Sequence, residues 1–164
     1  MADDFTITVQ RADEAATTLN RVAVKLDSIT QAMADELQAI GVWLEGEVKR
    51  RTPVDTGALR NSMFSELRVN GKSLEEMISS PLVYGPPVEY GSKPHFPPSA
   101  ALKGWARRKL GDENAAYAVA KAIAKRGTEP HDMFTEAFDA NQNALADKLE
   151  RAGIKVSEDV LRTL

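Results

Sequence analysis

One apolar stripe constrains the fold of this chain more than any other feature of its sequence. Seven apolar side chains recur at intervals of three or four residues: Leu26, Ile29, Met33, Leu37, Ile40, Leu44 and Val48. This spacing places them on one face of an α-helix, and such a face has to be buried against other elements. Gly41 and Gly46 each cost a helix about 1 kcal/mol relative to alanine. The stripe outweighs that cost and predicts a long amphipathic helix.

The long helix is expected to cover residues 11–51. Its sequence fits either one continuous rod or two helices, the second of which Asp27-Ser28 would cap. The helix has to end before Pro53, because this proline disfavours helical geometry at Thr52 and has no amide hydrogen to donate.

The residues that precede this helix alternate in character. Phe5-Thr6-Ile7-Thr8-Val9 places apolar and polar side chains in turn, which predicts a short strand or an arm within residues 1–10. Asp3-Asp4 is acidic where a signal peptide is basic and then apolar, so export by that route is not expected.

Residues 58–90 carry the pattern of a small antiparallel sheet. Alternating apolar side chains flank Asn70-Gly71, a dipeptide that tolerates positive φ and is a strong hairpin signal. A third strand is expected around residues 81–88. Pro86-Pro87 confines that strand to an edge or interrupts it.

Residues 91–98 contain three prolines and are expected to form a loop. Helices follow over residues 99–152, with Gly111 and Gly127 closing the first two of them. Gly153 is expected to break the last helix, which leaves residues 153–164 as a tail.

These elements add up to one domain of the α+β class: a long N-terminal amphipathic helix packed on a small antiparallel β-sheet, with C-terminal helices. A chain of 164 residues is long enough to bury a core without disulfides or metals. The absence of cysteine excludes disulfides, cysteine zinc sites and thiol catalysis. No apolar run is long enough to span a membrane, so no membrane partner is expected.

The net charge of −3 is distributed unevenly along the chain. Residues 93–128 carry eight basic and two acidic side chains, a net charge of +6. Residues 1–48 carry a net charge of −6, and residues 129–164 a net charge of −4. Two interpretations stay open: copies of the chain meet with complementary fields, or the blocks are solvated surfaces of incidental sign.

Few residues qualify for catalysis or metal binding. His95 and His131 are the two histidines, and neither belongs to a His-Glu-x-x-His or His-x-His pair. Glu75 and Glu76 are neighbours in an expected strand, so their side chains point to opposite faces and do not share a substrate atom. No Gly-x-Ser-x-Gly elbow and no glycine-rich phosphate loop is present. We therefore expect no enzymatic activity, no cofactor and no metal.

Two basic clusters end predicted helices, Lys49-Arg50-Arg51 and Arg107-Arg108-Lys109. Cations at a helix C-terminus offset the negative end of the helix dipole, which accounts for both clusters without a ligand. A sequence pI of about 5.5 is not that of a nucleic-acid reader. Passive contact with DNA in a lumen would need only a few cations.

Two motifs follow the long helix in a fixed order. The first is Arg51-Thr52-Pro53-Val54-Asp55-Thr56-Gly57-Ala58-Leu59-Arg60-Asn61-Ser62, and the second is Val83-Tyr84-Gly85-Pro86-Pro87-Val88-Glu89-Tyr90-Gly91-Ser92. The pair resembles the neck or tail-completion protein family of long-tailed bacteriophages, whose pattern is Thr-Pro-x-Asp-Thr-Gly-x-Leu-Arg-x-Ser and then Tyr-x-x-x-Val-Glu-x-Gly-Thr. Ser92 stands in place of the final threonine. The resemblance covers roughly residues 35–140, including the run from Pro94 to Gly111 and Arg126-Gly127-Thr128.

The resemblance implies a virion structural protein of the phage neck or tail, assembled in the host cytoplasm, that joins the capsid connector to the tail tube. It implies a homo-oligomeric ring, with a hexamer favoured, and partners on the connector or portal side and on the tail-tube side. The residues expected to shape the motif or to form its interface are Pro53, Asp55, Thr56, Gly57, Leu59, Arg60, Tyr84, Glu89, Gly91, His95, Phe96 and Trp105.

Elementary chemistry assigns roles to several of these residues. Asp55 and Thr56 are expected to bond to the backbone two residues on, and Gly57 to adopt positive φ, which turns the chain from helix to sheet. Glu89 is expected at the mouth of the proline loop, paired with Arg60 or with an arginine of a neighbouring subunit.

The stiff loop 91–98 and the helix after it are expected to contact the next subunit or the tail tube, with Phe96 and Trp105 as anchors. Two alternatives come from other classes of protein. One is a freestanding homodimeric helical adaptor that associates through the apolar stripe. The other is a hydrolase that uses His95 with Glu89.

Overall fold

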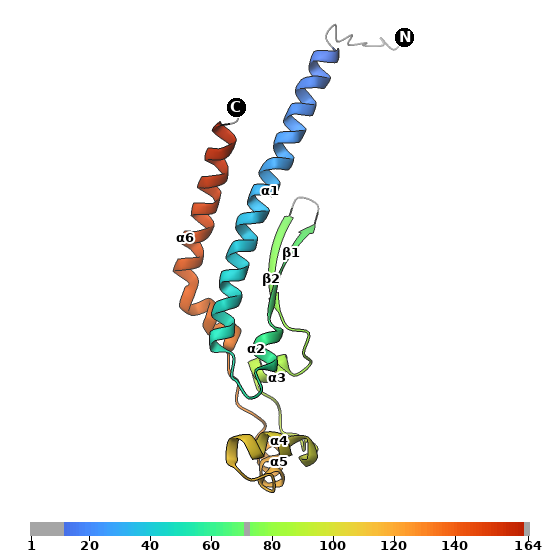
Figure 1. The fold of residues 1–164 in the computed structure, drawn as a ribbon, viewed down its shortest axis with the longest axis vertical. Coiled ribbons are helices and arrows are strands. Elements are labelled where there is room, and N and C mark those ends of the chain that lie inside the picture. Colours follow the sequence, from blue (N-terminus) through green and yellow to red (C-terminus); the bar gives the residue numbers. More distant parts are fainter. Residues whose placement is uncertain (1–11, 71–72, 163–164) are drawn as a thin grey trace, which may run out of the picture.

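A computed structural model describes residues 12–70 and 73–162 of the chain. Within these ranges it contains six helices and one antiparallel sheet of two strands, arranged in an elongated molecule (Figure 1). The α+β class predicted from the sequence is confirmed. The strand or arm expected within residues 1–10 lies outside the described ranges. No helix in them combines the length and the apolar character that a membrane crossing requires.

Helix α1 (Ala12–Arg51) is a single element of 40 residues, and it extends for about 60 Å. It confirms the predicted long helix and resolves the choice between one rod and two helices. The stripe residues Ile40, Leu44 and Val48 are buried. Thr52 closes the last turn, because its hydroxyl and its amide both donate to the Val48 carbonyl, at 2.8 and 3.0 Å.

Helix α6 (Met133–Arg162) runs antiparallel to α1 along one of its sides (Figure 1). The predicted break at Gly153 and the tail over residues 153–164 are therefore wrong, since the helix continues to Arg162. Ala152 and Val156, on either side of the glycine, are buried in the contact between the two helices. The apolar area that they remove from water outweighs the cost of about 1 kcal/mol for one helical glycine.

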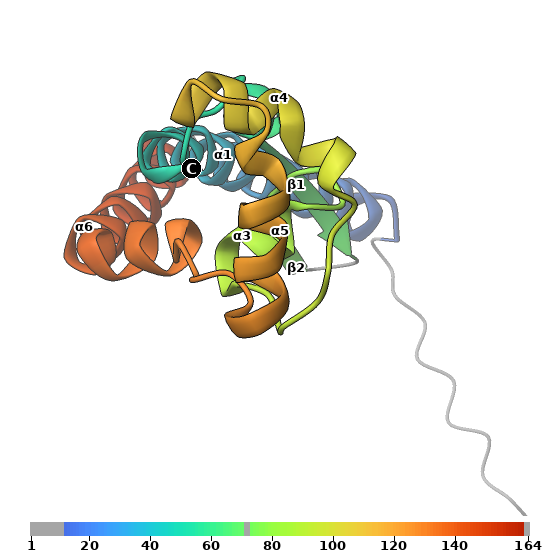
Figure 2. The same ribbon diagram turned by 90° about the horizontal axis from the view of Figure 1, so that it is seen from below.

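Strands β1 (Phe64–Asn70) and β2 (Ser73–Ser79) form the predicted hairpin, in which Leu67 lies opposite Glu76. The hairpin covers the side of α1 away from α6, so that α1 lies between the two (Figures 1 and 2). The face of the hairpin that carries Ser65 and Ile78 turns toward the interior.

The third strand expected around residues 81–88 is wrong, and the sheet covers only part of the predicted 58–90 segment. Helix α2 (Ala58–Ser62) precedes the hairpin, and helix α3 (Gly85–Tyr90) replaces the third strand. Pro86-Pro87 explains the difference. These residues have no amide hydrogens for a strand ladder, but the first turn of a helix has no intrahelical partner for those hydrogens anyway.

The main hydrophobic core lies where the end of α1, the start of α6 and helix α2 meet. Its buried members are Val48, Leu59, Met63, Met133 and Ala137. Leu59 of the first motif therefore packs into this core from helix α2.

Helix α4 (Ser99–Leu110) and helix α5 (Ala115–Arg126) form a pair at one end of the molecule (Figures 1 and 2). The loop before them and the glycines that end them are where the sequence predicts, with φ of 75° at Gly111 and 76° at Gly127. Alanines fill the buried part of this pair: Ala106, Ala116 and Ala120.

Candidate functional site

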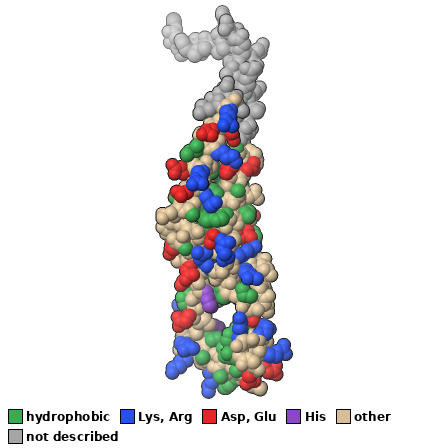
Figure 3. Space-filling model, turned by 60° about the vertical axis from the view of Figure 1, so that its left-hand side comes forward, with side chains coloured by type: hydrophobic (Ala, Val, Ile, Leu, Met, Phe, Trp, Pro, Cys, Tyr) green, Lys and Arg blue, Asp and Glu red, His purple; other side chains and the backbone are tan. Residues whose placement is uncertain are grey.

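The two sequence motifs converge on one groove between the main body and the α4–α5 pair. The groove has a volume of about 470 Å³ and is lined by Pro53, Val54, Asp55, Thr56, Gly57, Ala58, Leu59, Tyr84, Val88, Trp105, Lys109 and His131. Seven of the twelve predicted site residues belong to this lining, which we call the motif groove. The surface is hollowed where the body meets the α4–α5 end (Figure 3).

The segment between α1 and α2 forms the wall of the motif groove. Gly57 adopts the predicted left-handed conformation, with φ of 82°. The Thr56 hydroxyl accepts a hydrogen bond from the Ala58 amide at 3.3 Å, two residues on, as the sequence predicts. The Asn61 amide donates to the Gly57 carbonyl at 2.9 Å and starts the next helix.

Asp55 does not bond within its own turn, and this part of the prediction is wrong. Its carboxylate instead accepts a paired hydrogen bond from the guanidinium of Arg108 on α4, with 2.9 Å between Nε and Oδ1. The hydrogen bond and the charge of Arg108 lower the pKa of Asp55. Lys109 donates to the Val54 carbonyl at 2.9 Å. We call these two contacts the latch.

The latch gives two of the basic residues that end α4 a specific role. Both contacts of the latch are exposed, and water and salt screen the ion pair between Arg108 and Asp55. The latch therefore orients the α4–α5 pair on the body without adding much to global stability.

Glu89 is buried and does not lie at the mouth of the proline loop. Its Oε2 accepts a hydrogen bond from the Phe134 amide at 2.9 Å, and its Oε1 accepts from the amide and the hydroxyl of Thr135, both at 3.1 Å. The carboxylate thus caps α6 at the positive end of its dipole. The predicted pairing with Arg60 is wrong, since Arg60 is exposed on α2 and makes no ion pair among the described residues.

The capping role of Glu89 weakens the alternative of a hydrolase that uses His95 with Glu89. Both oxygens of Glu89 are occupied by the first turn of α6, so the carboxylate is not free to orient a histidine. His95 is exposed, and its ring Nδ1 lies 2.9 Å from the Lys93 carbonyl oxygen.

The chain enters and leaves the α4–α5 pair through a short antiparallel bridge. Ser92 and Thr128 exchange backbone hydrogen bonds of 3.1 Å in both directions, and their hydroxyls lie 2.9 Å apart. Gly91 has a φ of 72° and packs against the Thr128 carbonyl, and Gly127 packs against the Ser92 carbonyl. A Cβ atom at either glycine would collide with the opposing backbone, so we call this element the glycine bridge.

The two aromatic anchors expected at the interface lie in different places. Trp105 is half-buried in the motif groove. Phe96 lies outside it and packs edge-on against Tyr117 of α5, with 6.1 Å between ring centroids. More than half of the Phe96 surface is exposed.

A carboxylate pair that the sequence reasoning missed lies between α1 and the hairpin. Both oxygens of Glu76 are enclosed and have no hydrogen-bond partner among the described residues. The Glu76 side chain, including Oε1, occupies the space that a Cβ atom at Gly41 would fill. Burial raises the pKa of Glu76, and the charge of Glu45 raises it further. Burial also opposes ionisation of Glu45, but Lys49 and the Ser65 amide outweigh it and lower its pKa.

Glu76→Gln is expected to stabilise the protein by about 1 kcal/mol at neutral pH, because it removes a buried charge that has no partner. A raised carboxyl pKa means that the folded state holds its proton more firmly, so stability falls as pH rises from the ordinary glutamate range through the raised value. The gain should therefore disappear on acidification to about pH 4. Urea unfolding of this variant and of the unsubstituted chain, at neutral pH and at about pH 4, measures the difference in the free energy of unfolding.

Glu75→Gln is the matched control, since Glu75 is exposed on the opposite face of β2. It should change stability by no more than a few tenths of a kcal/mol. A gain for Glu76→Gln that persisted unchanged in acid would contradict the burial argument.

Comparison with protein-family models, with curated proteins and with solved structures found no match for this chain. In the described ranges, no three histidine or acidic side chains gather closely enough to hold a metal ion.

Proposed function

We propose that this chain is a virion structural protein of a long-tailed bacteriophage, which joins the capsid connector to the tail tube during head–tail assembly. The sequence resemblance over the two motifs is its starting point. The observation that carries the proposal is the convergence of both motifs, whose first residues are 32 positions apart, on the motif groove beside Trp105.

Exposed apolar side chains around the same end support an assembly role. Val83 is 90% exposed and Tyr90 is 75% exposed, and Phe96, Leu110 and Tyr117 are each more than half exposed. Phe96 and Tyr117 are in contact with each other, and exposed apolar side chains that gather in this way are typical of surfaces that partners cover. A closed ring requires two different patches of this kind on each subunit.

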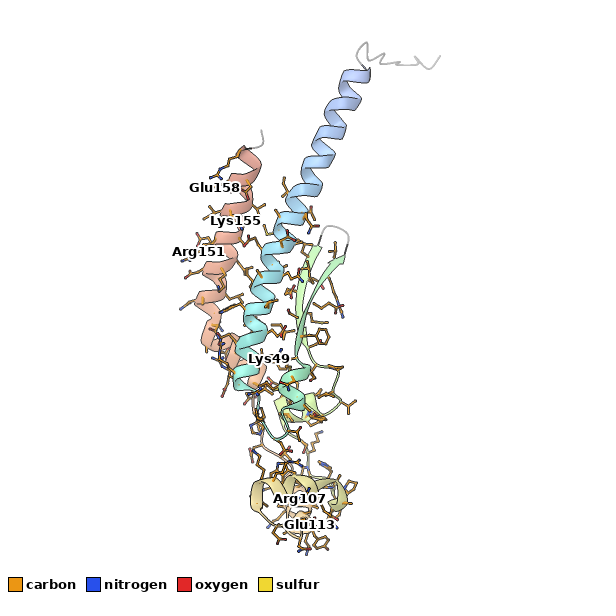
Figure 4. The ribbon with its side chains drawn as sticks, viewed as in Figure 1. Lys49, Arg107, Glu113, Arg151, Lys155 and Glu158 are labelled. Carbon is orange, nitrogen blue, oxygen red and sulfur yellow. The ribbon has the colours of Figure 1, made fainter. Side chains whose placement is uncertain are left out.

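The charge distribution supports association with an acidic surface. The α4–α5 end carries exposed cations that make no ion pair among the described residues: Lys93, Lys103, Arg107, Lys125 and Arg126. Lysine and arginine side chains surround this end in Figure 3, and Figure 4 places Arg107 and Glu113 there. On α6, by contrast, cations and acids are intermixed, as Arg151, Lys155 and Glu158 are in Figure 4.

The alternative of a homodimeric adaptor that associates through the apolar stripe has less support. The stripe from Ile40 to Val48 is already buried within the chain. Phage assembly remains the function that the surfaces favour.

Phe96→Ala and Trp105→Ala test the proposal. Each is expected to leave the chain folded and to lower its incorporation between connector and tail tube at least about tenfold, because aromatic anchors dominate interface energies. Circular dichroism checks the fold, and the yield of joined, infectious particles in a phage that depends on the variant measures assembly. Phe138→Ala on α6 is the control, an exposed aromatic away from the motif groove. Normal yields with both test variants would refute the proposal.

A further inference from the structure

The motif groove is open in the single chain and has the chemistry of a docking site for an apolar, acidic segment. Leu59 and Val88 are in its lining, and Val54 and Tyr84 are 42% and 43% exposed beside them. Lys109 is also in the lining, where it donates to the Val54 carbonyl, and it adds a positive charge to the groove. An occupant that places apolar side chains in the groove and carboxylates toward α4 would match both features.

Residues 1–11 of the same sequence have this composition. Asp3-Asp4 precedes Phe5, Ile7 and Val9, which alternate with polar residues. An extended peptide with this pattern presents its three apolar side chains on one side and leaves two carboxylates at one end. Asp3 and Asp4 are opposite in charge to Arg107 of α4, which is exposed and makes no ion pair among the described residues.

Geometry separates this segment from the groove of its own chain. The groove begins at Pro53, just after the C-terminal end of α1, whereas residues 1–11 precede Ala12, the first residue of that helix. The 40 residues of α1 separate the two by about 60 Å. Eleven residues reach about 40 Å at most when fully extended. The segment therefore reaches only a groove that belongs to another copy.

We propose that residues 1–11 of one copy dock in the motif groove of the next copy. Their apolar side chains lie against Tyr84 and Trp105, and Asp3-Asp4 faces the basic end of α4. Each copy gives a segment to one neighbour and receives a segment from another, which is a head-to-tail contact that can close into a ring. The inference rests on the self-association in the proposed function and not on the virion role itself.

The absence of cysteine in the natural chain permits a direct test by cross-linking. The Thr8→Cys chain and the Ala58→Cys chain are mixed under mild oxidation. A disulfide between positions 8 and 58 can then form only between two separate chains. Thr8 is one of the polar residues in the alternating sequence, and Ala58 is an exposed residue of the groove lining. Disulfide-linked heterodimers are expected, and Phe5→Asp in the Thr8→Cys chain should reduce them at least tenfold.

Ile154→Cys replaces Ala58→Cys in the control mixture, because Ile154 is exposed on α6, far along the chain from the groove. Equal cross-linking to Ile154→Cys, no cross-linking to Ala58→Cys, or no effect of Phe5→Asp would overturn the inference. A chain that carries both Thr8→Cys and Ala58→Cys should give products larger than dimers. A product that stops at the dimer would indicate reciprocal exchange and would overturn the head-to-tail arrangement.

The two proposals fail in different ways. If cross-linking fails while the unsubstituted chain still joins connector and tail tube, the docked segment is wrong and the proposed function stands. If cross-linking succeeds while the chain binds neither structure, the docked segment stands and the phage role is wrong.

Discussion

Glu89→Ala is expected to lower the free energy of unfolding by about 3 kcal/mol. The substitution removes the acceptor for two amides and one hydroxyl in the first turn of α6. Helix caps contribute about 1 kcal/mol when exposed, and hydrogen bonds to a charged group in a buried site contribute more. The negative charge at the positive end of the helix dipole adds to the loss. Urea unfolding followed by circular dichroism measures the difference.

Glu129→Ala is the matched control, since Glu129 is exposed and also precedes α6. It should change stability by less than about 0.5 kcal/mol. Glu89→Gln should recover part of the loss, because it keeps one acceptor oxygen but turns an amide group toward a donor. Equal stability of Glu89→Ala and Glu129→Ala would show that the buried carboxylate is not the cap of α6.

Gly127→Ala is expected to cost about 3 kcal/mol and to disrupt the glycine bridge. The residue has a φ of 76°, and its new methyl group would collide with the Ser92 carbonyl, which is backbone and has little room to move. Because the bridge connects the α4–α5 pair to the body, its amides should lose protection first. Hydrogen exchange at Ser92 and Thr128, together with the unfolding midpoint, measures the effect.

Gly111→Ala separates collision from conformational preference. Gly111 has nearly the same φ, 75°, but a Cβ atom there would meet nothing within 4 Å. It should cost only about 1 kcal/mol, the ordinary penalty of a left-handed conformation for alanine. If the two variants lost equal stability, the close approach at the glycine bridge would not be the cause.

These expectations indicate what the motif residues do in the fold. Thr52 ends α1, Asp55 fastens α4, Glu89 holds α6, and Gly91 permits the glycine bridge. Each acts at a junction between elements. We infer that the two motifs set the position of the α4–α5 pair on the body, and that the interaction surface is the groove that results.

Several elements could be predicted from the sequence by itself, because they depend on residues that are close together in the chain. A spacing of three and four residues predicted α1, Asn70-Gly71 predicted the hairpin, and Gly111 and Gly127 predicted where α4 and α5 end. Each signal depends on neighbours in the chain, either through helix or strand periodicity or through the φ that a residue tolerates.

Tertiary structure decided the rest, because the deciding contacts join residues distant in sequence. Glu89 caps a helix 45 residues away, and Asp55 pairs with a guanidinium 53 residues away. Glu76 looks like an ordinary strand residue in the sequence. Its side chain packs against α1 because Gly41 has no Cβ atom in that space. Gly153 stays helical only because α1 covers its neighbours. No local pattern encodes these contacts, since their free energy comes from surfaces that exist only after the chain has folded.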